Sequence, residues 1–550
     1  MAGVSGDTLR RFIQSNDTNF SLDSVSETLK KLLLSHCAQV LQEDSKNDLL
    51  DSLRCVRILT RDDQCLDQLS TDDFLKPLFT CAFVSYGSAE DVHTIESLKA
   101  LSNLVFKRPV VLKTLRSFGI VERLLERLKA HISSRSRGDV LLLDLKLFFL
   151  LSGLESSIRR ELAENSDAFC LFGNLLSSFQ NEPFSPQNCS LMSELLKVVY
   201  NVAYAIQRDI PEAKLQAPQY DRYCVLIREL LTGLTISNDD QRQLIGQLVN
   251  FLNIVPRRSF VHLLSLLDQP PSSERTSNDI NEQMPAIQAL IDYLSFQLNS
   301  LDESGAATSP MQQTSTTRLD EALCPVLNAL IRGSQANRSI RKYCRSKILP
   351  HLGNDARRLP EEGSTLRNRL CKLLTNPQHG VSELVALLLF VLCKEDISRA
   401  IKYTGFGNFA GFLARHALLA GASKKRTRKR EIVGDTTTNS TSNEEFDSSS
   451  AEEYSSNSSA SDTEEYERLK NNINPVTGRW EADRPHPLEG MSEEQKEYVT
   501  MELVNKIDQL QRSGLIKPGT VGEDGRVRPV EHVLELLEQT HGQKTQDDSE

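Results

Sequence analysis

Leu98–Leu104 (LKALSNL) is a short apolar segment with an asparagine near its end, and versions of it recur along the chain. The related segments are Leu196–Val202 (LKVVYNV), Ile245–Phe251 (IGQLVNF) and Leu323–Ala329 (LCPVLNA). Each has an aliphatic residue five places before its asparagine. Self-similarity at a regular separation indicates a repeat architecture.

The separation of equivalent positions is about 46–52 residues, close to the period of HEAT and armadillo repeats. These positions are Arg57, Asn103, Phe149, Asn201 and Asn250. Between residues 22 and 420, apolar residues recur at intervals of three and four, which is typical of amphipathic helices, and strand-like alternation is absent. We therefore predict an all-α, armadillo/HEAT-like superhelical solenoid over residues 1–422, with a concave groove and an inserted loop at 302–317.

The recurring asparagines have two interpretations. An asparagine inside a helix lowers helix propensity and needs hydrogen-bond partners. One asparagine per repeat could form a ladder along the groove and hold the backbone of a bound segment. Alternatively, each amide could satisfy a polar group of a neighbouring helix.

Composition limits the class of protein. The chain has 550 residues, a net charge of −10 and a pI of about 5.7, which argues against nucleic acid as the main partner. The 11 cysteines include no C-x-x-C pair and are predicted to be free, buried and reduced, as in the cytosol. No signal peptide is evident, and the longest apolar run, Leu384–Cys393, is shorter than the roughly 20 residues of a membrane span.

The composition changes after residue 422. A basic run, Lys424–Arg430, precedes a stretch rich in Ser, Thr and Glu, so residues 423–470 are predicted to be a disordered linker. The basic run is either a targeting signal or a solvated part of this linker. Several Ser residues in the acidic stretch have an acid three places later, a spacing that suits an acidophilic protein kinase.

Residues 471–550 contain further signals for ordered structure. Asn474–Arg479 is rich in turn-forming residues, and Ser492–Gln495 has the pattern of a capping box. The box predicts a helix at about 492–512, and Pro529–Glu538 suggests another short helix. The first helix would present an apolar face for docking, formed by Val499, Leu503, Ile507 and Leu510.

Motifs of side-chain catalysis are absent from the sequence. It has no phosphate-binding G-K-[ST] loop, no dinucleotide fingerprint, no H-E-x-x-H zinc motif and no G-x-S-x-G nucleophile elbow. We therefore expect a binding protein without catalytic residues, metal or cofactor.

Several blocks resemble the synembryn family (resistance to inhibitors of cholinesterase). The blocks that carry this resemblance are Val56–Asp62, Leu366–Leu370, Ile401–Asn408, Ala410–Leu413, Ser461–Tyr466, Ile473–Arg479 and Leu488–Glu497. They are spread over nearly the whole chain, and those near the C-terminus are the most specific.

The resemblance implies a helical solenoid that binds heterotrimeric G-protein α subunits in the GDP-bound or nascent form. Such proteins act as folding chaperones and as receptor-independent guanine nucleotide exchange factors that stabilise the nucleotide-free α subunit. The resemblance also implies cytoplasmic localisation, recruitment to the cell cortex or plasma membrane, and phosphorylation of the acidic linker. An alternative function is that of an armadillo-type scaffold or nuclear-import adaptor with a different partner.

The resemblance further implies a set of site residues. In this family the C-terminal helix of the α subunit lies in the groove, and the region beyond the linker contacts the nucleotide-binding domain. The corresponding groove residues are Arg57, Arg61, Asn103, Phe149, Tyr200, Tyr204, Asn250, Arg345 and Lys347. The corresponding phosphorylation sites are Ser461, Ser455 and Ser456.

Overall fold

The computed structural model divides the chain into two compact units, Met1–Trp480 (unit 1) and Glu481–Glu550 (unit 2). The described residues are 6–43, 48–84, 91–209, 217–264, 284–305, 312–350, 358–376, 379–416, 472, 474, 477, 479, 491–512, 519–521 and 527–529. Unit 1 contains α1 (Gly6–Asn16), α2 (Glu27–Glu43), α3 (Leu49–Leu59), α4 (Leu66–Leu69), α5 (Asp72–Phe83), α6 (Val92–Lys107), α7 (Val111–Ser117), α8 (Ile120–Ser134), α9 (Asp139–Leu154), α10 (Ser156–Glu164), α11 (Ser166–Ser177), α12 (Pro186–Asp209), α13 (Ala217–Gly233), α14 (Asp239–Leu252), η2 (Arg257–Leu263), α15 (Pro285–Gly305), α16 (Gln312–Ala336), α17 (Arg338–Ile348), α18 (Leu366–Leu374), α19 (His379–Leu392), α20 (Ile397–Thr404) and α21 (Phe406–Arg415). Unit 2 contains α23 (Glu493–Arg512), β1 (Gly519–Val521) and β2 (Val527–Pro529).

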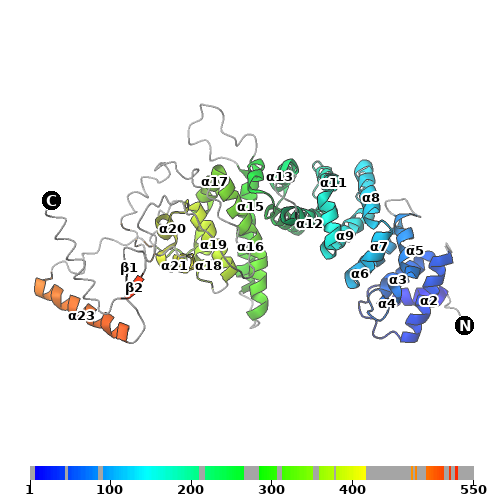
Figure 1. Cartoon of the computed structure of the whole chain (residues 1–550), viewed down its shortest axis with the longest axis horizontal. Coiled ribbons are helices and arrows are strands. Elements are labelled where there is room, and N and C mark those ends of the chain that lie inside the picture. The colour runs from blue at the N-terminus through cyan, green and yellow to red at the C-terminus, as the bar shows by residue number, and fades with distance from the viewer. Residues whose placement is uncertain are drawn as a thin grey trace, which may run out of the picture. The chain divides into compact units, whose positions relative to one another are not determined.

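A row of helices runs through unit 1, and each member packs on the next (Figure 1). We call this set the central row; it consists of α3, α6, α9, α12, α14, α16 and α19. A second set of helices covers it, with α2 against α3, α5 against α6, α8 against α9 and α11 against α12. This recurrence confirms the predicted all-α repeat solenoid.

Helix α3 runs parallel to α6, and α9 to α12, as the order of their side-chain contacts shows. Between α3 and α6, Arg57 contacts Glu96 and Thr60 contacts Asn103. For the second pair, Lys197 and Asn201 contact Phe149 and Ser152 in the same order, and Asn201 Nδ2 donates to Ser152 Oγ at 3.0 Å. After α14, Asn253 and Val255 contact Pro325 and Arg332 of α16 in the same order. Equivalent positions of successive repeats therefore lie side by side.

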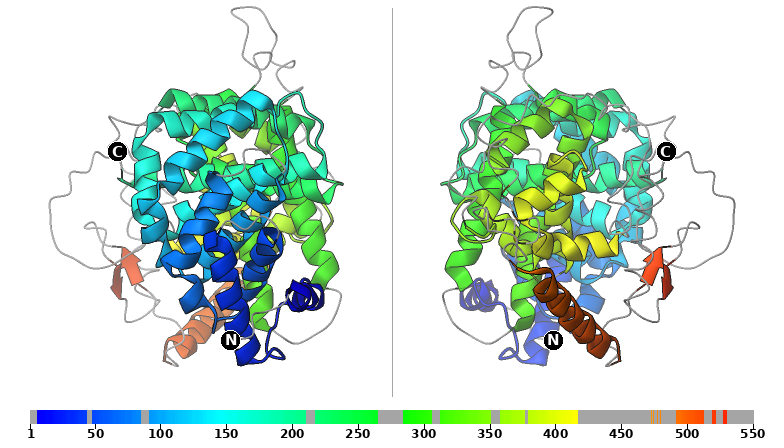
Figure 2. Two further views of the ribbon diagram at one scale, coloured as in Figure 1. Left: turned by 90° about the vertical axis from the view of Figure 1, so that its right-hand side faces the viewer. Right: turned by 90° about the vertical axis from the view of Figure 1, so that its left-hand side faces the viewer.

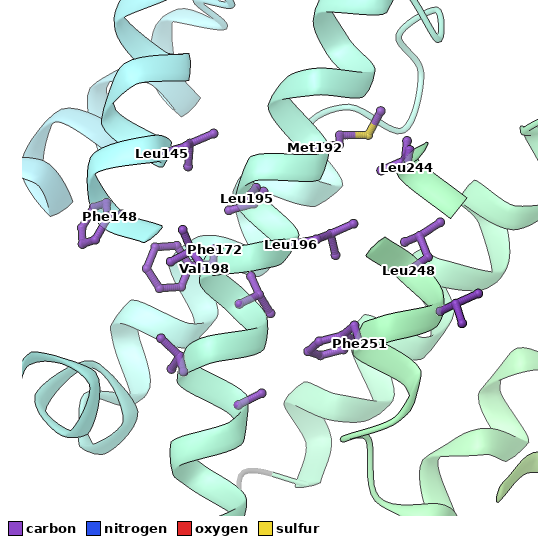
Figure 3. Close-up of a cluster of buried hydrophobic side chains, with 14 of the residues drawn as sticks. Leu145, Phe148, Phe172, Met192, Leu195, Leu196, Val198, Leu244, Leu248 and Phe251 are labelled. Carbon is purple, nitrogen blue, oxygen red and sulfur yellow. The ribbon is translucent and has the colours of Figure 1, made fainter. Parts of the chain in front are cut away.

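Apolar side chains fill the space between neighbouring repeats. Figure 3 shows Leu195 of α12 on the side facing α9, and Leu196 on the side facing Leu248 of α14. Phe148 of α9 packs edge-on against Phe172 of α11, with ring centres 5.7 Å apart. The end-on views of Figure 2 show that successive helices of unit 1 are rotated relative to one another, as expected for stacked repeats.

Two of the sequence blocks named above meet at the end of the helical row. Arg367 of α18 is 1% exposed, and its Nε donates to the carbonyl oxygen of Tyr403 at 3.1 Å. Asn408 Nδ2 donates to Glu361 Oε2 at 2.8 Å. Between α20 and α21, Gly405 has a φ of 76°, which favours glycine because a Cβ atom is strained there. These blocks therefore build the end of the solenoid.

The structure differs from the sequence predictions in two places. The predicted loop at 302–317 is partly helical, because α15 continues to Gly305 and α16 begins at Gln312. In unit 2, β1 and β2 form an antiparallel pair that the sequence analysis missed. Pro529, predicted to begin a helix, ends β2, and residues 530–538 lie outside the described residues. The domain boundary at 422 and the linker 423–470 also lie outside them.

The predicted capping box at the start of α23 is confirmed. The backbone N–H of Gln495 donates to Ser492 Oγ at 3.3 Å, and the backbone N–H of Ser492 donates to Gln495 Oε1 at 3.1 Å. The reciprocal pair satisfies two donors that a helix N-terminus otherwise leaves unpaired. No helix in the described residues is long and apolar enough to cross a membrane.

The cysteines are free, and all except Cys170 and Cys324 are buried. Burial raises the pKa of Cys344 to about 12 and that of Cys324 to about 11. Because the thiolate is the reactive species, we expect a disulfide reagent such as DTNB to modify the half-buried Cys170 first and the buried thiols only after denaturation. Mass spectrometry of the singly labelled chain checks this, and early labelling of Cys344 or Cys393 would contradict it.

Candidate functional site

The predicted groove residues from Arg57 to Asn250 lie on or beside successive members of the central row. Arg57 is on α3, Asn103 on α6, Phe149 on α9 and Asn250 on α14, and all four are half-buried. Residues of the core are buried more deeply. We call the surface formed by these residues together with Arg61, Lys99, Lys197, Tyr200 and Tyr204 the central-row face.

The two arginines of this face contact the chain's own N-terminal segment. Arg57 Nε donates to Glu96 Oε2 at 2.5 Å, and Arg57 Nη2 donates to Asp17 Oδ1. Arg61 donates to the backbone oxygens of Asn16 and Asn19 at 2.9 and 2.7 Å, and to that of Asp17 at 2.9 Å. The hydrogen bond from Arg57 lowers the pKa of Asp17, so this carboxylate is charged at neutral pH.

Two of the recurring asparagines satisfy a polar group of a neighbouring helix, the second interpretation offered by the sequence. Asn103 Nδ2 donates to Thr60 Oγ1 at 2.9 Å, and Asn201 Nδ2 donates to Ser152 Oγ, so each joins its helix to the preceding member of the row. The side chain of Asn250 makes no hydrogen bond to another described residue. Asn328 of α16, the asparagine of the fourth segment, likewise makes no side-chain hydrogen bond to another described residue, so Asn250 and Asn328 are both available to a ligand.

Aromatic and cationic side chains alternate on the α9–α12 part of this face. The ring of Tyr200 stacks on that of Tyr204, with centres 6.5 Å apart and planes inclined by 9°. Tyr204 is 42% exposed. Lys197 Nζ lies 5.7 Å from the centre of the Phe149 ring. Such a surface suits a helix that presents apolar and acidic side chains.

Sequence reasoning missed two acidic residues that orient the lysines of this face. Glu96 Oε1 accepts from Lys99 Nζ at 3.0 Å, and Glu194 Oε1 accepts from Lys197 Nζ at 2.9 Å. The signal was present as an E-x-x-K-x-x-x-N pattern that occurs at residues 96–103 and again at 194–201. In both repeats the charged pair thus precedes the recurring asparagine.

Arg345 and Lys347 lie on α17, outside the central row. Arg345 is 5.9 Å from the centre of the Tyr403 ring, and Lys347 Nζ is 5.4 Å from that of Tyr343. Burial, and then the nearby charges of Arg399, Arg345, Arg338 and Arg341, lower the pKa of Lys394. These cations form a basic cluster near the end of the solenoid.

Helix α23 exposes more apolar surface than its predicted face. Of the predicted residues, Leu503 is 58% exposed, Val499 and Ile507 are half-buried, and the side chain of Leu510 lies outside the described residues. Tyr498 and Met501, which were not predicted, are 71% and 53% exposed. Met491, Glu494, Gln495, Tyr498 and Val499 line a shallow depression on this helix.

The remaining site predictions lie outside the described residues. They are the phosphorylation sites Ser461, Ser455 and Ser456 and the basic run at 424–430. Among the residues that the structure describes, no group of three or more His, Cys, Asp or Glu side chains is placed to hold a metal ion.

The fold and the exposed face of its central row define a helical-repeat protein. The profile of the family described as guanine nucleotide exchange factor synembryn matches residues 52–526, and the chain belongs to that family. The region matched includes the central row from Ser52 of α3 onward, α23 and β1.

Individual relatives align with nearly the whole chain. Chaperone Ric-8A of Gallus gallus is 31% identical and aligns with 96% of this chain and 93% of its own length. Chaperone Ric-8A of Bos taurus is also 31% identical, over 98% of this chain and 95% of its own. A solved engineered protein covers 70% of this chain and 95% of its own at 13% identity, but its TM-score of 0.29 is too low to bear on the fold.

Proposed function

We propose that this chain binds G-protein α subunits, as a folding chaperone and as an exchange factor that stabilises their nucleotide-free state. The observation that carries the proposal is the central-row face, where exposed Tyr204, available Asn250 and oriented lysines lie on α6, α12 and α14. The C-terminal helix of the α subunit would lie along this face. The family is described as an exchange factor and its relatives as chaperones, in agreement with the two activities.

Helix α23 provides the second contact in this proposal. Its exposed Tyr498, Met501 and Leu503 form an apolar surface of the kind that docks on another protein. We propose that it contacts the nucleotide-binding domain while the central-row face holds the C-terminal helix. Two joined contacts increase the affinity for one partner by effective concentration.

Exchange in this scheme needs no catalytic side chain. The solenoid prefers the empty α subunit over the GDP-bound one, and this difference in affinity weakens nucleotide binding by linkage. Binding of GTP then reverses the preference by mass action. Phosphorylation of the acidic linker by an acidophilic kinase, a cytoplasmic location and recruitment to the cell cortex belong to the same proposal.

The test is the rate of GDP release from one purified α subunit of each class. We expect the full-length chain to accelerate release from at least one class, and the Tyr498→Ala/Met501→Ala variant to accelerate it less. Lys506→Ala, which removes an exposed ion pair with Glu502 on the same helix, is the control. Unchanged GDP release with every class would exclude the exchange activity, and co-expression would then test chaperoning alone.

A further inference from the structure

Arg57 lies between two carboxylates that differ in burial. The side chain of Glu96 is 8% exposed, and it also accepts a hydrogen bond from Lys99. The side chain of Asp17 is 54% exposed, and Arg57 is its hydrogen-bonding partner among the described side chains. Glu96 is thus a fixed part of the central row, whereas Asp17 projects from the segment that follows α1.

The N-terminal segment is held to α3 independently of the Asp17 carboxylate. Arg61 binds the backbone oxygens of Asn16, Asp17 and Asn19, and its guanidinium lies 5.0 Å from the centre of the Phe20 ring. Asn16 Nδ2 also donates to the backbone oxygen of Phe12. The Asp17 side chain can therefore leave Arg57 without release of the segment.

We infer that Asp17 fills an anion subsite of the central-row face, and that the C-terminal carboxylate of the bound helix replaces it on Arg57. This inference rests on the proposed function, which places that helix on this face. The Arg57 side chain is 13% exposed, but that of Asp17 is 54% exposed, so water and salt screen this carboxylate and its removal from Arg57 costs little free energy. The buried Glu96 stays on Arg57 and keeps the guanidinium oriented.

The arrangement gives the chain a built-in competitor. A partner whose carboxylate binds Arg57 has to displace an attached carboxylate, which lowers its apparent affinity. A partner without a carboxylate at this position does not bind more tightly when the Asp17 carboxylate is removed. Asp17 thus tunes affinity for one chemical group of the partner.

The test compares full-length wild type, Asp17→Asn and Asp23→Asn. Asp23 is an exposed acid nearby that contacts Ser21 and not Arg57, so it is a matched control. The probes are two synthetic peptides with the sequence of the helix that ends a G-protein α chain, one with a free terminal carboxylate and one amidated. Their affinities are measured by fluorescence anisotropy, and thermal melting verifies that each variant is folded.

We expect Asp17→Asn to bind the free-carboxylate peptide about two- to fivefold more tightly than wild type, as follows from the typical strength of an ion pair screened by water. Its affinity for the amidated peptide, and all affinities of Asp23→Asn, should equal those of wild type. If wild type binds the free-carboxylate peptide and Asp17→Asn binds it equally or more weakly, the inference is overturned and the proposed function stands. If no chain binds either peptide, the placement of the helix on this face fails, and the inference with it.

Discussion

Replacing Asp144 with alanine is expected to lower the free energy of unfolding by about 3–5 kcal/mol. Asp144 is fully buried in α9, and it accepts two hydrogen bonds from Arg127 of α8, one of them from Nε at 2.7 Å. Arg127 also donates to the backbone oxygen of Ala82 in α5. Removal of the carboxylate leaves a largely buried guanidinium without its counter-charge and weakens the junction of three helices. Urea denaturation followed by far-ultraviolet circular dichroism measures the loss.

Two further variants separate the charge effect from a general effect of mutation. Asp139→Ala removes an exposed acid from the same helix and should cost less than about 1 kcal/mol. The double variant Arg127→Met/Asp144→Leu removes both charges and should recover part of the lost stability. A loss below about 1 kcal/mol for Asp144→Ala would show that the buried pair is not a major support of this junction.

Replacing Tyr204 with alanine is expected to weaken binding of a G-protein α subunit by about 2 kcal/mol, or roughly 30-fold. Tyr204 is exposed, so truncation removes contact area for a partner but little packing within the solenoid. Its stacking on Tyr200 presents both rings as one rigid apolar surface. The affinity is measured by titration of the full-length chain with the GDP-bound α subunit.

The control is Leu32→Ala, because Leu32 is 43% exposed on α2, a helix outside the central row. It removes a side chain of matched exposure and should leave the affinity unchanged. Equal thermal midpoints of both variants and wild type would verify that the fold is intact. Wild-type affinity in Tyr204→Ala would exclude the tyrosine pair from the interface.

The fold could be predicted because a repeat protein carries the same local sequence pattern many times. Leu98, Leu196 and Ile245 each precede an asparagine by the same interval, and the structure places these segments on α6, α12 and α14, three members of the central row. Predictions of secondary structure failed where the element is short or where its sequence is mostly polar. The strands β1 and β2 have three residues each, and the polar stretch after Asp302 is partly absorbed into two long helices.

The sequence predicted which residues lie along the helical row better than it predicted which atoms their side chains contact. Asn103 and Asn250 occupy equivalent positions, yet Asn103 bonds to Thr60 while Asn250 has no described partner. That difference depends on a hydroxyl at the end of the preceding helix. Arg57 and Arg61 were predicted as ligands of a partner, and no spacing rule shows that Asp17, some 40 residues earlier, reaches the first of them.

The parallel direction of these helix pairs in the central row has an electrostatic consequence. Each helix carries a macrodipole with partial positive charge at its N-terminus and partial negative charge at its C-terminus. Because α3 runs parallel to α6, and α9 to α12, the dipoles of each pair add instead of cancelling as in an antiparallel pair. The N-terminal ends of each pair therefore lie together and carry partial positive charge, while their C-terminal ends carry partial negative charge. A helix approaching the face meets a transverse field that favours one of its two orientations.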